Sequence, residues 1–183
     1  MFRDIFRLLL FLFLITGCSV KPEPIHKSDV ERLAVMFQGL DGNITYREAE
    51  VLSRDLFLQT ARLTKEFDLV SPPWLHNTLV NIGLRKKGLC YHWSDALYLA
   101  MKEKQYDDFA FHPAGANIGE FWREHNVLVI TAKEKPFDSG IVIDPWRDSG
   151  RLYFAKVTED RKYEWQERKE RCLDDQIRRD DDR

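Results

Sequence analysis

The sequence predicts an α+β fold in which helices come first and an antiparallel sheet follows. Four stretches between residues 30 and 104 carry apolar side chains at helical spacing, and β-branched apolar runs appear only after residue 126. Helices followed by strands are typical of a helical layer packed on an antiparallel sheet. The chain has the length of one domain with a single hydrophobic core.

The first two helices are indicated by apolar spacing and by one capping signal. The apolar positions of the first helix are Val30, Leu33, Ala34 and Phe37. Thr45 and Glu48 have the spacing of a capping box, in which each side chain accepts a hydrogen bond from the other residue's backbone N–H. This signal opens a longer helix whose apolar face comprises Ala49, Leu52, Leu56 and Leu63.

Two further helices are expected before the sheet. Ser71 and Pro72 favour a helix start, because a capping hydroxyl is followed by a proline suited to the first turn. The apolar positions of this third helix are Leu75, Leu79, Val80 and Leu84. Gly88 interrupts the pattern, and a fourth helix is predicted from about Cys90 to Lys104. Its buried face comprises Trp93, Ala96, Leu97, Ala100 and Met101.

Three strands are predicted in the second half of the chain. Residues 127–131 and 141–143 are β-branched and apolar on both faces, which is typical of central strands. Residues 152–157 form the third predicted strand. The sequence therefore places all its helices before residue 105 and all its predicted strands after residue 126.

The first seventeen residues have the pattern of an export signal. Arg3 and Arg7 precede an unbroken apolar run, Leu8–Ile15, which is shorter than the roughly 20 residues of a membrane-spanning helix. The run ends in Ile-Thr-Gly-Cys, which resembles the bacterial lipobox. This resemblance implies cleavage before Cys18, lipid on Cys18 and, with Ser19 next, an outer-membrane location facing the periplasm. An ordinary secretory signal with a chance cysteine is the alternative.

The remaining chain divides into a tether, a domain and a tail. Residues 18–28 contain Pro22 and Pro24 and are expected to form a lipidated tether, 29–167 the domain, and 168–183 a charged, disordered tail. Cleavage changes the formal net charge from −2 to −3, since Arg3, Arg7 and Asp4 are removed. This acidic balance gives no indication of nucleic-acid binding. A disulfide between Cys90 and Cys172 is conceivable in the periplasm, but the predicted disorder of the tail argues against it.

Cys90 is the candidate nucleophile. It follows Gly88 and Leu89 and precedes an amphipathic helix, so the thiol is expected at a helix N-terminus. The dipole there favours a thiolate, and the free N–H groups of the first turn can receive an oxyanion. Taken alone, however, a cysteine in such a sequence is more often a buried structural residue.

His125 and Asp144 supply the partners that a reactive thiol needs. If Lys133–Pro136 is a four-residue turn, the resulting hairpin places His125 directly opposite Asp144, on one face of the sheet. The carboxylate would then orient the imidazole and stabilise its protonated form, as the third member of a catalytic triad does. His112 is the rival base, but no obvious hairpin gives it an acid partner.

The order Cys, His, Asp and these placements resemble the papain-like and transglutaminase-like thiol enzymes. The resemblance spans roughly residues 71–165 and implies that Cys90, His125 and Asp144 are the catalytic residues. Papain-like proteases also place a glutamine shortly before the cysteine, to complete the oxyanion hole, and this chain has none between Gln59 and Cys90. Asn77 and Asn81, four residues apart on the predicted third helix, are candidate substitutes.

A thiol acyl-transfer enzyme is therefore the leading hypothesis from sequence. Attack on an amide or ester carbonyl would give an acyl-thioester, which water or an amine would resolve. A cell-envelope protein or a cell-wall peptide is the expected substrate. No cofactor is expected, and the Cys and His spacing does not indicate a metal site. The alternative is a non-catalytic binding lipoprotein that uses the same fold as a scaffold.

Overall fold

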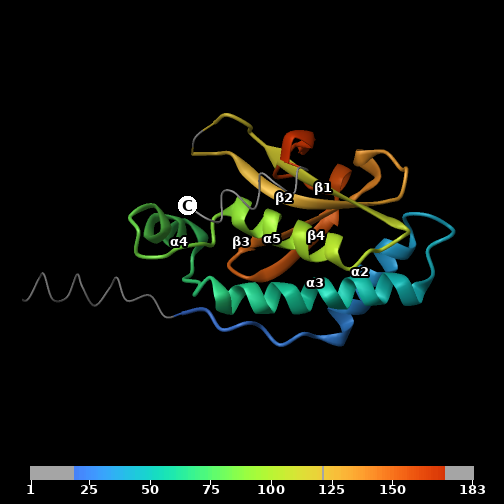
Figure 1. Ribbon diagram of the computed structural model, residues 1–183, viewed down its shortest axis with the longest axis horizontal. Helices are drawn as coiled ribbons and strands as arrows, with labels where there is room; N and C mark the ends of the chain where they lie inside the picture. Colours follow the sequence, from blue (N-terminus) through green and yellow to red (C-terminus); the bar gives the residue numbers. More distant parts are fainter. Residues whose placement is uncertain (1–18, 121, 172–183) are drawn as a thin grey trace, which may run out of the picture.

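The computed structural model describes residues 19–120 and 122–171, and in them four helices precede a five-stranded antiparallel sheet (Figure 1). The helices are α2 (Lys27–Gln38), α3 (Tyr46–Glu66), α4 (Pro73–Asn81) and α5 (Cys90–Glu103). The strands are β1 (Phe109–Ala116), β2 (His125–Ala132), β3 (Ile141–Asp148), β4 (Arg151–Lys156) and β5 (Gln166–Glu167). The predicted α+β class is thus confirmed.

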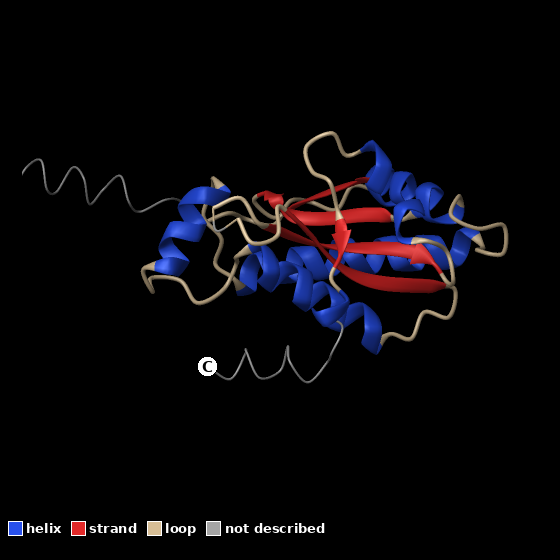
Figure 2. Ribbon diagram, turned by 90° about the horizontal axis from the view of Figure 1, so that it is seen from above, coloured by secondary structure: helices blue, strands red, loops and turns tan. Residues whose placement is uncertain are grey.

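The sheet has the order β4-β3-β2-β1-β5, and the helices cover one of its faces. Figures 1 and 2 show α5 lying along the sheet, with the long helix α3 on the far side of α5. Leu128 and Ile130 of β2 point towards these helices and belong to the main hydrophobic core. The core is therefore built between α3, α5 and the central strands.

The opposite face of the sheet is covered by the chain that follows β4. Val127 and Val129 of β2 point to this face, where they form a second apolar cluster with Val142 and Trp165. Between β4 and β5 the chain crosses this face, because β4 and β5 form opposite edges of the sheet. This crossing segment, residues 157–165, brings its side chains to the end of β2 where His125 lies.

The predicted helix starts are correct except in one detail. Thr45 Oγ1 accepts a hydrogen bond from Glu48 N at 3.3 Å, and Thr45 N donates to Glu48 Oε2 at 2.9 Å, so the capping box is confirmed. Helix α5 begins at Cys90, as predicted. Helix α4 begins at Pro73 without a side-chain cap, so the predicted capping role of Ser71 is wrong.

Two strands of the sheet have no counterpart in the sequence prediction. Strand β1 contains Pro113 and Gly115, both of which weaken a strand pattern. Pro113 is tolerated because β1 has only the two-residue strand β5 on its outer side. On this outer side Pro113 takes part through its carbonyl alone, which accepts a hydrogen bond from Arg168 N at 2.8 Å, so the missing N–H is not required.

Both ends of the described chain are docked on the domain. Ser19 forms a β-bridge with Val70, and Val20 N donates to Leu69 O at 2.7 Å, so the predicted tether is held from its first described residue. At the other end, Arg168 was expected to open the disordered tail, but it packs against Gly115 and is largely buried. The predicted signal peptide, Cys18, Cys172 and the rest of the tail lie outside the described residues. None of the helices described is long and apolar enough to cross a membrane.

Candidate active site

Cys90 is held at the first position of α5 by the two residues before it. Gly88 has a φ of +120°, and a Cβ at this position would lie 2.1 Å from Nε2 of His76, so only glycine fits. His92, one turn into the helix, accepts hydrogen bonds through Nδ1 from the N–H groups of Gly88 and Leu89, at 3.1 and 3.2 Å. These contacts fix the backbone of residues 88 and 89, which lead into Cys90.

His125, the first residue of β2, forms a buried pair with Asp144 of β3. Its Nε2 lies 2.7 Å from Asp144 Oδ2, and the two side chains are 2% and 1% exposed. The predicted direct opposition is wrong by two residues, because β2 and β3 pair Leu128 with Ile143 and continuing this register places Val127 opposite Asp144. The error arose because the connection is longer than four residues and includes a 3₁₀ turn, Phe137–Ser139. A shift of two leaves the face unchanged, so the two side chains still meet.

Asp144 is the centre of a buried charge network. Arg147 lies three residues further along the chain. Its backbone N–H donates to Asp144 Oδ1 at 3.1 Å, and its Nε donates to Asp144 Oδ2 at 2.9 Å. The guanidinium then pairs with Asp160 of the crossing segment, with Nη2 to Oδ2 at 2.7 Å. Trp165 Nε1 donates to the same Asp160 carboxylate at 3.0 Å. Sequence analysis missed this network because the crossing segment showed no recognisable motif.

The network determines which protonation state of His125 is favoured. Burial alone lowers the pKa of the imidazole, but the charge and hydrogen bond of Asp144, with a contribution from Cys90, raise it to about 9. Burial also raises the pKa of the Asp144 carboxyl, but His125 and Arg147 outweigh it and hold that pKa below its usual range. Two carboxylates surround one guanidinium, so a protonated His125 balances the buried charge.

The second nitrogen of His125 is the one that remains for the thiol. Nε2 is committed to Asp144, while Nδ1 is buried and forms no well-aligned hydrogen bond within the described residues. Three aromatic rings surround the imidazole, with centroids 4.6 to 5.5 Å from its own: Trp146, Tyr163 and Trp165. These rings exclude water from the imidazole. On the remaining side, the polar group beside the imidazole is the Cys90 thiol.

Asn126, the residue after His125, also reaches the thiol. Neighbouring strand residues point to opposite faces, so Asn126 faces α5, and its Nδ2 lies 3.8 Å from Cys90 Sγ. Arg168 donates through Nη1 to Asn126 Oδ1 at 2.9 Å, which fixes the amide with its NH₂ towards sulfur, because arginine can only donate. Sequence analysis assigned no role to Asn126, although its position beside the candidate base was a usable signal.

Arg168 is itself held by Glu124, the residue before His125. Arg168 Nη1 lies 2.6 Å from Glu124 Oε1, and Gly119 N donates to Glu124 Oε2 at 2.9 Å. The same carboxylate thus joins the β1–β2 connection to the C-terminal segment. Glu124, His125 and Asn126 are consecutive, so the start of β2 carries three side chains of the site.

The described contacts of the two oxyanion candidates from sequence do not include Cys90. Asn77 of α4 accepts a hydrogen bond from Trp146 Nε1 through Oδ1 at 3.0 Å, so it supports a ring that packs on His125. Asn81 is the exposed last residue of α4. The side-chain amide that the described contacts place at the thiol is that of Asn126, whose Nδ2 lies 3.8 Å from Cys90 Sγ.

The remaining histidines have other structural roles. His112, the rival base, has an acid partner that comes from the distant strand β5 and not from a hairpin: its Nδ1 lies 2.7 Å from Glu167 Oε1, and its Nε2 lies 3.0 Å from Thr131 Oγ1. Both nitrogens are therefore engaged at the β5 side of the sheet. His76 is buried and accepts from Val70 N through Nδ1, while its Nε2 lies 2.9 Å from Lys87 O. His76 thus links Val70, before α4, to Lys87, shortly before Cys90.

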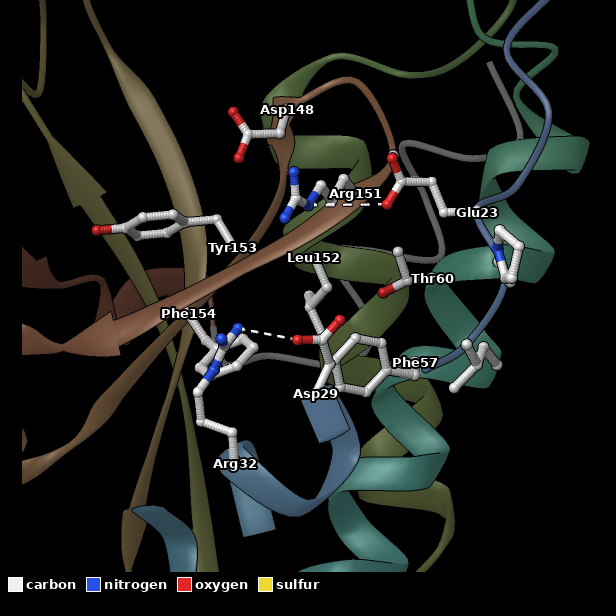
Figure 3. Close-up of a pocket in the computed structure, with 14 residues that line it drawn as sticks. Glu23, Asp29, Arg32, Phe57, Thr60, Asp148, Arg151, Leu152, Tyr153 and Phe154 are labelled. Carbon is white, nitrogen blue, oxygen red and sulfur yellow. Dashed lines mark ion pairs between the residues drawn. The ribbon is translucent and has the colours of Figure 1, made fainter. Parts of the chain in front are cut away.

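A cavity of about 300 Å³ lies away from this cluster (Figure 3). It is formed by the N-terminal extended segment, α2, α3 and β4, and ion pairs join Arg151 to Glu23 and Arg32 to Asp29 along it. Cys90, His125 and Asp144 do not line it. Within residues 19–120 and 122–171, no group of three His, Cys, Asp or Glu side chains is placed to hold a metal ion.

Comparisons with protein-family models, with curated proteins and with solved structures found no match for this chain. The functional argument therefore depends on the geometry of the cluster. That geometry brings together a half-buried thiol at a helix start, a buried imidazole whose pKa is raised, and a carboxylate that orients it.

Proposed function

We propose that this protein is a cysteine-dependent acyl-transfer enzyme of the papain-like or transglutaminase-like kind, anchored in the bacterial cell envelope by lipid on Cys18. Cys90 is the nucleophile, His125 the general base and acid, and Asp144 the residue that orients His125. The substrates are amides or esters of envelope proteins or cell-wall peptides.

The observation that carries the proposal is the buried pair of His125 and Asp144 beside Cys90. Nε2 of His125 is 2.7 Å from Asp144, and its other nitrogen has no well-aligned partner among the described residues. A buried polar atom without a partner is costly, and a catalytic role is one of the reasons for which native structures keep such an atom. A purely structural histidine would gain stability by satisfying both nitrogens, as His76 and His112 do here.

The reaction follows from this arrangement. The Cys90 sulfur attacks the carbonyl carbon as a thiolate, while Nδ1 of His125 carries the proton in an imidazolium stabilised by Asp144. The imidazolium then protonates the leaving amine or alcohol as the carbonyl re-forms, which leaves an acyl-thioester on Cys90. Water or a second amine attacks the thioester, its proton passes to His125, and the thiol returns.

Groups that face the developing oxyanion lower the barrier to this attack. The N–H groups of the first turn of α5 carry the positive end of the helix dipole. The Asn126 amide adds a side-chain donor near the sulfur. Donors of this type are worth roughly 10²–10³-fold in turnover when one is removed.

The chain offers an internal control for a test of this proposal, since Cys172 is a second thiol in the same molecule. We expect iodoacetamide to alkylate Cys90 about tenfold or more faster than Cys172 at pH 7, because the imidazolium of His125 lies beside the Cys90 sulfur. Peptide mass spectrometry of one sample measures both rates.

Two variants separate the proposed enzyme from a binding scaffold. His125→Ala should bring the rate of Cys90 alkylation down to that of Cys172, because the imidazole partner of the thiol is gone. Cys90→Ala should leave the unfolding midpoint nearly unchanged while abolishing acyl-enzyme formation with an activated ester. If Cys90 and Cys172 are alkylated at the same rate in the parent protein, the thiol is unassisted and the scaffold alternative holds.

A further inference from the structure

The first described residue of the chain is joined to the segment between α4 and α5 through a single carboxylate. Ser19 Oγ donates to Asp68 Oδ1 at 2.6 Å, and Arg85 Nη2 lies 3.0 Å from Asp68 Oδ2. Arg85 Nε donates to the backbone carbonyl of Asp68 as well, at 3.1 Å. The position of Ser19 is thus fixed relative to Arg85.

Beside Arg85 lies an exposed apolar surface with a basic border. Trp74 is 67% exposed, Ile82 62% and Leu84 59%, which is unusual for side chains of this size in one short segment. Arg85, Lys86 and Lys87 follow Leu84 directly. We call this the α4 surface, consisting of Trp74, Ile82, Leu84 and residues 85–87.

The α4 surface has a fixed position in the fold. His76 accepts from Val70 N and lies 2.9 Å from Lys87 O, so it ties both ends of the segment to the strand-like pair that holds Ser19. Figure 1 places α4 at the end of the molecule where the described chain begins. Movement of this surface independently of Ser19 would require these bonds to break.

We propose that the α4 surface rests on the lipid bilayer to which Cys18 is anchored. The inference depends on the lipid anchor of the proposed function, because Cys18 is one residue, about 3.8 Å along the chain, from the docked Ser19. With no free linker between them, the bilayer surface must lie beside Asp68 and Arg85. Apolar side chains bordered by cations suit the boundary between acyl chains and anionic headgroups.

The tryptophans of the chain provide a direct test. The lipidated protein, with its lipid verified by intact mass, is reconstituted in vesicles of phosphatidylglycerol and phosphatidylethanolamine whose acyl chains are brominated near the headgroup. Trp74 is the tryptophan of the α4 surface, whereas Trp93 and Trp165 are buried. We expect bromine to quench the parent protein and Trp74→Phe to lose most of that quenching.

Trp122→Phe is the matched control, since Trp122 is even more exposed, at 86%, but belongs to the β1–β2 connection. Quenching that persists in Trp74→Phe and disappears in Trp122→Phe would overturn the proposal, as would an absence of quenching in the parent. A blue shift of Trp74 emission with rising concentration of unlipidated Cys18→Ser protein would show instead that this surface joins two copies. A missing lipid on Cys18 is detected separately by mass, so failure of the anchor and failure of the surface contact remain distinguishable.

Discussion

His125 and Arg147 bond to the same atom, Oδ2 of Asp144, at 2.7 and 2.9 Å. A single carboxylate oxygen therefore orients the proposed base and is itself oriented by a guanidinium. Arg147 does not touch Cys90 in the described contacts, so it is a positioning residue. Its pairing with Asp160 couples the geometry of His125 to the chain that crosses the far face of the sheet.

The first prediction concerns Arg147. Arg147→Met leaves Asp144 and Asp160 without their shared cation in a buried setting, and breaking a buried pair in this way typically costs about 3–5 kcal/mol. Urea unfolding should show a loss of this size. The exposed pair of Arg123 and Glu120 is the control, and Arg123→Met should cost under about 1 kcal/mol. Equal effects of the two substitutions would contradict the network.

The second prediction concerns the pH dependence of stability. In the folded protein the pKa of His125 is raised to about 9 from an ordinary value of 6.5, so the folded state binds the proton more tightly. Its contribution is complete below pH 6.5 and is lost as the pH rises through 9. At about 1.4 kcal/mol per pKa unit, the loss is on the order of 3 kcal/mol.

Unfolding midpoints measured from pH 6.5 to 9 should fall in the parent protein and fall less in His125→Gln. The effect of His76 on stability has the opposite pH dependence. Burial lowers the pKa of this imidazole, so its contribution to the free energy of unfolding is lost as the pH drops below 6.5. A parent protein whose stability is flat across the alkaline window would show that His125 is not held as an imidazolium.

The third prediction concerns Asn126. Asn126→Ala removes the amide that lies 3.8 Å from the thiol, and we expect thioester formation to slow by about 10²-fold. The alkaline fall in stability should persist, since the His125–Asp144 pair is untouched. Asn117→Ala is the control: this amide donates to a backbone carbonyl of the β1–β2 connection and not to Cys90. A similar slowing in both variants would indicate a general effect of the connection.

The fourth prediction concerns the end of the chain, where Arg168 holds the Asn126 amide. Truncation after Arg171 keeps that contact, and the unfolding midpoint and Cys90 reactivity should stay near those of the parent. Truncation after Glu167 removes Arg168, and Cys90 reactivity should fall towards that of Asn126→Ala. Arg168→Met in the full chain tests the side chain alone. Full reactivity in the shorter truncation would exclude the role of Arg168.

Sequence patterns located the starts of the longer helices well because the signals lie within a few residues, but Leu84, expected on the apolar face of the third helix, lies beyond the end of α4 and is exposed. The capping box of Thr45 and the glycine before Cys90 are local, and both have the predicted consequence. The face shared by His125 and Asp144 was also predictable, because strand periodicity survives an error of two residues in register. Pro113 and Gly115 concealed β1, since its pairing with β2 depends on residues about fifteen positions away.

The rest of the site could not be derived from local patterns. Arg147, Asp160 and Trp165 are ordinary residues in sequence and become a network only because the crossing segment returns beneath the sheet. Asn126 and Arg168 are 42 positions apart, and neither has a partner that short-range spacing could suggest. Buried polar contacts of this kind are decided by the packing of distant segments.

The docked position of Ser19 also determines how the proposed enzyme would meet its substrates. A flexible tether of about ten residues would let the domain range over about 18 Å, but the bonds of Ser19 and Val20 to residues 68–70 remove that freedom. With lipid on Cys18, the molecule searches a plane by lateral diffusion and samples little of the compartment above it. Its turnover would then follow the number of substrate molecules per area of membrane, and a substrate released into solution would escape it.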